Sequence, residues 1–145
     1  MRTHHFVKQL DHAAIVGAIK NAEANTSGQI RVFIQRGEMS ADPLDAAQRR
    51  FARLGMEKTA ERNAILVFVA PRARKFAVVG DEGVHAKCGP AFWERLVAKM
   101  RNHFKNENFT EALVEAINEA GKLLAQYFPR TGPARNELPD TVIES

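Results

Sequence analysis

Apolar side chains recur every three or four positions in four segments of the chain, which is the spacing of helices that bury one face. The residues before three of these segments favour a helix start, because Asp and Asn accept hydrogen bonds from free amides and Pro is tolerated in the first helical turn. The pattern predicts helices over residues 6–24, 43–54, 90–104 and 109–128.

Three shorter segments have the pattern of strands. Residues 29–35 alternate between apolar and polar side chains and predict a strand with one buried face. Asn63–Ala70 is apolar on both faces, as in a central strand, and a short basic turn joins it to Lys75–Gly80. A further short strand is expected in residues 84–89. The order α-β-α-β-β-α-α predicts an α/β fold, a three-layer α/β/α sandwich around a small mixed sheet.

The chain has 145 residues and 45% hydrophobic residues, which fits one globular domain. We assign residues 1–128 to this domain, and residues 129–145, with three prolines and no periodicity, to a disordered tail. The longest apolar run, Ala64–Ala70, is far shorter than the roughly 20 residues that span a bilayer. No signal peptide precedes the domain, so we expect a cytoplasmic protein that does not bind membranes.

The charge pattern argues against nucleic-acid binding. The net charge is +4, and the basic clusters alternate with acidic or apolar residues, as on solvated helix faces. A nucleic-acid site would need a continuous basic stripe with exposed aromatic residues. The aromatic side chains lie at core spacing on the last two predicted helices, which predicts packing and disfavours a cofactor site. They are Phe92, Trp93, Phe104 and Phe109.

Polar residues converge at one edge of the predicted sheet. The two parallel strands begin at the same edge, and the antiparallel strand ends there. From this polar rim we predict ligand binding by Ser27, Gln29, Arg62 and Asn63, with Glu61 beside them. Nucleotide binding is disfavoured, because related sheets bind nucleotides at the opposite, carboxyl edge and no glycine-rich phosphate loop is present.

Asp81 and Glu82 are the predicted metal ligands on this rim, because carboxylate oxygens suit Ca²⁺ or Mg²⁺. The alternative is an ion pair between Asp81 and Arg62 in a turn that favours Asp for conformational reasons. Cys88 has only His85 nearby as a base, so a buried structural cysteine is favoured over a nucleophile. No catalytic residue is assigned.

Several blocks together resemble the TPM domain family, in its short cytoplasmic bacterial branch. They are LGM-x-x-T-x-x-RN before the hairpin, GDEGVH after it and FW in the next helix. The resemblance implies an α/β/α sandwich, and in some members acid phosphatase activity or binding of calcium or other divalent metals. This chain has Gln29 where the family usually has Glu, which removes one carboxylate from the rim.

Two hypotheses for the function follow. The first is a binding module that takes a divalent cation or a small ligand at the rim and acts through a protein partner. The second is a weak metal-assisted acid phosphatase, in which a cation on Asp81 and Glu82 polarises a phosphoryl oxygen and Arg62 stabilises the developing charge. The lost carboxylate at Gln29 favours the module.

Overall fold

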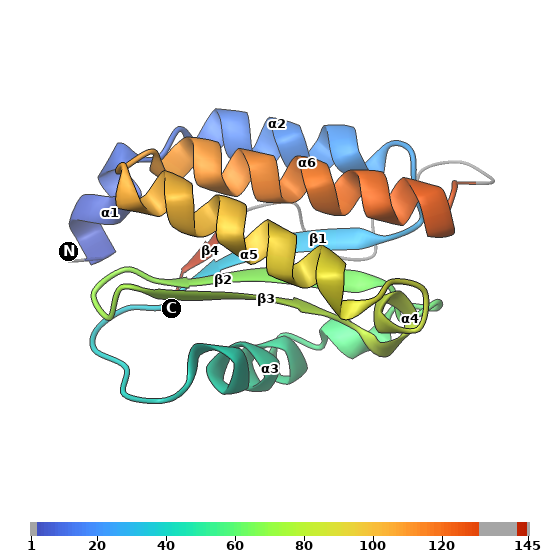
Figure 1. Cartoon of the computed structure of the whole chain (residues 1–145), viewed down its shortest axis with the longest axis horizontal. Coiled ribbons are helices and arrows are strands. Elements are labelled where there is room, and N and C mark those ends of the chain that lie inside the picture. Colours follow the sequence, from blue (N-terminus) through green and yellow to red (C-terminus); the bar gives the residue numbers. More distant parts are fainter. Residues whose placement is uncertain (1–2, 131–141, 145) are drawn as a thin grey trace.

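A computed structural model describes residues 3–130 and 142–144. It consists of a central sheet with helices on both faces (Figure 1). Helices from the first and last parts of the chain cover one face, and the helix Pro43–Arg53 covers the other (Figure 1). The predicted three-layer α/β/α sandwich is therefore confirmed.

The sheet has four strands in the order β3-β2-β1-β4. Neighbouring β1 and β2 are parallel, β3 is antiparallel to β2, and β4 is parallel to β1. The sequence pattern did not predict β4, whose three residues fall in the segment assigned to the tail. Residues 131–141 and 145 of that segment lie outside the described residues. The strands are β1 (Gln29–Ile34), β2 (Ala64–Ala70), β3 (Lys75–Gly80) and β4 (Val142–Glu144).

Most helices begin near the predicted residues, and two segments differ from the prediction. The helix expected over residues 6–24 is split, because the Asp11 carboxylate accepts a hydrogen bond from Ala14 N and starts a new helix there. The strand expected in residues 84–89 is wrong, because residues 82–85 are helical. The helices are α1 (Thr3–Gln9), α2 (His12–Glu23), α3 (Pro43–Arg53), the 3₁₀ turn η1 (Met56–Lys58), α4 (Glu82–His85), α5 (Pro90–Lys105) and α6 (Phe109–Tyr127).

The sheet divides the core into two apolar clusters. Alternate residues of β1 and β2, such as Val32 and Val67, pack against α1, α2, α5 and α6. The intervening residues of the two strands lie on the other face of the sheet and pack beneath α3. Among them, the rings of Phe33 and Phe68 stack with their centres 5.9 Å apart. Both faces of β1 are therefore buried, whereas the sequence pattern had predicted one.

No helix in the described part of the chain is long and apolar enough to cross a bilayer.

Candidate functional site

The predicted polar rim forms at one end of the sheet. The first residue of β1, Gln29, lies opposite Ala64, the first residue of β2, and Gly80 at the end of β3 lies opposite Ile65. The short helix α4 follows β3 at this end (Figure 1). The topology thus brings the loops before β1 and β2 together with the segment after β3, as the sequence analysis predicted.

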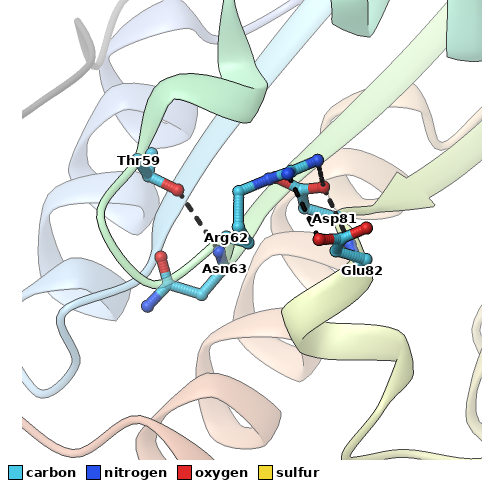
Figure 2. A network of polar contacts seen from close by, with 5 residues as sticks. All are labelled: Thr59, Arg62, Asn63, Asp81 and Glu82. Atoms are coloured by element: carbon cyan, nitrogen blue, oxygen red, sulfur yellow. Dashed lines mark hydrogen bonds and ion pairs between the residues drawn. The ribbon is translucent and has the colours of Figure 1, made fainter.

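Arg62 binds both predicted metal ligands. Its Nε and Nη2 donate to the two carboxylate oxygens of Asp81 at 2.7 and 2.8 Å, and its Nη1 donates to Glu82 at 3.2 Å (Figure 2). Asp81 is 5% exposed. The hydrogen bond from Arg62 to Asp81 raises the pKa of the guanidinium above its already high value. Asp81 was predicted either to bind a metal or to pair with Arg62, and in the structure it pairs with Arg62.

Two local features hold this ion pair in place. Asp81 also accepts a hydrogen bond from Glu82 N at 2.8 Å and so caps α4. Arg62 has a left-handed backbone with φ of 53°, which residues other than Gly, Asn and Asp adopt rarely. Gly83 N donates to Arg62 O at 2.9 Å, which ties α4 to the loop before β2. Asp81 therefore links the end of β3, α4 and the Arg62 loop.

A second polar cluster lies on the same rim and joins the loops before β1 and β2. Ser27 Oγ donates to the Glu61 carboxylate, and Asn63 Nδ2 donates to Ser27 Oγ at 3.1 Å and to Glu61 Oε2 at 3.2 Å. Thr59 Oγ1 accepts from the backbone N–H of Asn63 at 3.3 Å, an interaction visible in Figure 2. The sequence pattern predicted Glu61 on the rim without a ligand role, and it indicated Thr59 only as part of the family block, not as a rim residue.

Asn63 carries an unusual unsatisfied group. Its side chain is buried, with the residue 1% exposed, and its Oδ1 has no hydrogen-bond partner among the described residues. A buried acceptor without a partner costs about 1–3 kcal/mol. Rotating the amide by half a turn would place Oδ1 beside Ser27 Oγ and Glu61 Oε2, where three oxygens would meet and a cation would be needed to hold them.

The donor set decides which residues fit a divalent cation. Within residues 3–130 and 142–144 there is no group of three or more His, Cys, Asp or Glu side chains suited to a metal. Arg62 already occupies the Asp81 carboxylate. The second cluster offers a hydroxyl, an amide and a carboxylate, the oxygen donors that Ca²⁺ and Mg²⁺ accept. A cation therefore fits better at Ser27, Glu61 and Asn63 than at Asp81 and Glu82.

The remaining sequence candidates are Gln29, Cys88 and His85. Gln29 is buried at the start of β1. Cys88 is half-buried, and burial raises the pKa of its thiol, which is opposite to the shift that activates a nucleophile. The His85 ring packs against Trp93 with ring centres 5.1 Å apart. These observations favour the structural cysteine over the nucleophile.

Comparisons with known proteins agree with this architecture. The family model described as "TPM domain" matches residues 2–123. The BA42 protein of the psychrophilic bacterium Bizionia argentinensis is 36% identical, with 92% of each chain covered and a TM-score of 0.84. The N-terminal domain of the cg2496 protein of Corynebacterium glutamicum is 16% identical, covers 77% of this chain and 70% of its own, and has a TM-score of 0.60, which shows a shared fold. No curated protein matches the chain.

Proposed function

The chain belongs to the TPM domain family, and from this premise we propose that it is a binding module whose rim takes a divalent cation, Ca²⁺ or Mg²⁺. Ser27, Glu61 and Asn63 would hold the cation. The observation that carries the proposal is the buried Oδ1 of Asn63, which has no partner among the described residues, while Nδ2 of the same amide lies beside the Glu61 carboxylate. With the Asn63 amide rotated by half a turn, a bound cation would supply the missing partner of Oδ1 and neutralise Glu61.

The charges of the rim support this assignment. Arg62 faces the two carboxylates Asp81 and Glu82, so these three groups together carry one net negative charge. Glu61 adds another. A divalent cation is attracted to such a rim, but a site with a single direct carboxylate binds weakly, in the range of about 10⁻⁴–10⁻³ M. The cation would bridge the loops before β1 and β2 and so order the surface that a small ligand or a protein partner meets.

The phosphatase alternative has less support from the geometry. Phosphoryl transfer needs cationic groups aimed at the transferred oxygens. Arg62, the rim residue predicted for that role, is already bound by two carboxylates. The protein partner and the cytoplasmic location stay predictions from the sequence.

A cation titration tests the proposal. With CaCl₂ or MgCl₂ added to about 10 mM, an upper limit set by the expected weak affinity, we expect the backbone amide signals of residues 27–29 and 61–63 to shift. Glu61→Gln should weaken the binding several-fold, and Glu94→Gln, an exposed change on α5, should leave it unchanged. If the signals of residues 27–29 and 61–63 stay fixed, the proposal is wrong.

A second variant separates the two possible cation sites. Arg62→Gln releases the Asp81 and Glu82 carboxylates from their guanidinium. If the cation binds at Glu61, Arg62→Gln should change the cation affinity only by the small amount expected from the loss of one nearby positive charge. If the sequence-predicted ligands Asp81 and Glu82 hold it, Arg62→Gln should tighten binding strongly, and Glu61→Gln should do little. Hydrolysis of p-nitrophenyl phosphate that is equal in the parent and in Asp81→Ala would refute the phosphatase alternative.

A further inference from the structure

A cavity of about 660 Å³ lies at the end of the molecule opposite the rim. In Figure 1 this is the end where α1, the last turn of α5, the first turn of α6 and the β2–β3 turn gather. Val69 and Ala70, at the carboxyl end of β2, are among the residues that line it. Open α/β sheets bind their ligands at the carboxyl ends of parallel strands, so this edge has the usual position of a binding site.

Four phenylalanine rings from four different elements form the apolar part of the cavity wall. Phe6 lies 4.9 Å from Phe109 and 6.3 Å from Phe104, measured between ring centres, and Phe76 lies 5.0 Å from Phe104. Pro71 completes this wall. The packed rings are a rigid apolar surface of the kind that lines small-molecule sites.

The same cavity is lined by four cationic side chains and one acidic one, Glu107. The cationic residues come from the β2–β3 turn, the first residue of β3 and the last turns of α5, and they are Arg74, Lys75, Arg101 and Lys105. The lining residues therefore carry a net charge of about +3 by simple count of ionised side chains.

Most of these cations have no carboxylate partner among the residues that the structure describes. Lys75 donates to the Ala41 carbonyl at 3.3 Å. For Arg74, Arg101 and Lys105, no carboxylate lies within ion-pair distance in the described part of the chain. Elsewhere on α5, by contrast, Lys99 pairs with Glu115 and Glu119 of α6. The cavity thus concentrates positive charge that the fold leaves available.

We propose that this cavity binds a small amphipathic organic anion, with an acyl or aromatic body against the phenylalanine wall and a carboxylate or phosphate group among the cations. Its volume lies within the roughly 300–1,000 Å³ of typical small-molecule sites. Arginine guanidinium groups suit both kinds of head group, because their paired N–H donors match carboxylate and phosphate oxygens. This site is separate from the cation rim and does not depend on it.

Matched eight-carbon probes test the proposal on the full chain. Octanoate and octyl phosphate carry the two head groups, octanol has the apolar body alone, and inorganic phosphate has the head alone. We expect the amide signals of residues 69–76 and 101–109 to shift with octanoate or octyl phosphate. We also expect octanol and inorganic phosphate to bind about ten-fold more weakly or worse, because each lacks one half of the recognised chemistry. The stronger of the two anions identifies the head group.

Two single variants on α5 give the matched comparison. Arg101→Gln removes a cation of the cavity, and Arg95→Gln removes another exposed arginine of the same helix, one that does not line the cavity. Arg101→Gln should weaken octanoate or octyl phosphate binding about three- to ten-fold, as expected for one lost charge-assisted hydrogen bond. Arg95→Gln should change it less than two-fold. Retained amide spectra show that both variants are folded.

Three results would overturn the proposal. Equal affinity for octanol and the anions would mean an apolar cavity without charge recognition. Equal weakening by Arg95→Gln and Arg101→Gln would mean a general charge effect. Sedimentation with phosphatidylglycerol vesicles, without any amide shift on adding octanoate or octyl phosphate, would mean that the cationic end meets a membrane surface and no small ligand.

Discussion

Gly83 packs closely against the backbone of the rim loop before β2. It lies in α4, and a Cβ placed on it would be 2.4 Å from Glu61 O and 2.5 Å from Arg62 O. Both contacts are to backbone atoms, and ordinary van der Waals contact begins at 3.4 Å. In Gly83→Ala, α4 or the loop before β2 must therefore move by about 1 Å, since no side chain can rotate away.

The cost follows from two opposing effects. Overpacking of this kind destabilises by about 1–3 kcal/mol, and replacing glycine by alanine in a helix returns up to about 1 kcal/mol. We expect a net loss of about 1–2 kcal/mol in the free energy of unfolding, which lowers Tm by about 3–8 °C for a chain of this size. Because the displaced segment carries Glu61 and Arg62, the amide signals of Asn63 and Asp81 should shift as well.

Urea unfolding and amide spectra of the parent and Gly83→Ala measure both effects. Gly17→Ala is the control, since a Cβ at Gly17 meets nothing within 4 Å. An unchanged urea midpoint with an unchanged slope would refute the reasoning, because it would mean that α4 does not pack against the backbone of the preceding loop as described.

Further changes test other contacts. In Gly121→Ala the new Cβ would lie 2.6 Å from Ala22 Cβ and push α2 and α6 apart, so we expect about 1–3 kcal/mol of destabilisation. Gly17→Ala, where a Cβ meets nothing within 4 Å, should stabilise the fold by about 0.5–1 kcal/mol. Chemical denaturation of both variants compares the two effects. Asp42→Ala removes the side-chain cap of α3 and should cost about 1 kcal/mol in the same assay, with no loss if the cap is immaterial. Burial raises the pKa of Cys88, so its neutral thiol stabilises the fold at low pH, and this contribution is lost as pH rises through the folded pKa. The pH midpoint of iodoacetamide labelling should therefore be higher in the folded protein than in the unfolded chain, and equal midpoints would contradict this expectation.

The layered fold was predictable because its signals are local. Apolar spacing identified the helices, and the fully apolar Ala64–Ala70 identified the central strand, whose seven residues are all buried. The convergence of Ser27 and Asn63 was also predictable, since parallel strands begin at the same edge. The helix break at Asp11 was missed, because apolar spacing continued through it and only the cap marks the boundary.

The opposite pocket was not predictable from local pattern. The sequence pattern predicts Phe104 and Phe109 as core residues and the basic clusters as solvated faces, and each interpretation is reasonable for a single helix or turn. Only the packing of α1, α5, α6 and the β2–β3 turn brings Phe6, Phe76 and the cations of separate elements to one cavity.

By itself, the sequence determined the layers, the central hairpin, the family and the edge at which polar residues meet, because hydrophobic periodicity and strand direction specify them. Only the tertiary structure decided which groups those polar residues contact. Whether Asp81 faces a cation or Arg62 depends on a left-handed turn and a capped helix within a few ångströms, and no spacing in the sequence encodes that distance. The same holds for Asn63 Oδ1, which has no hydrogen-bond partner among the described residues because of its buried surroundings.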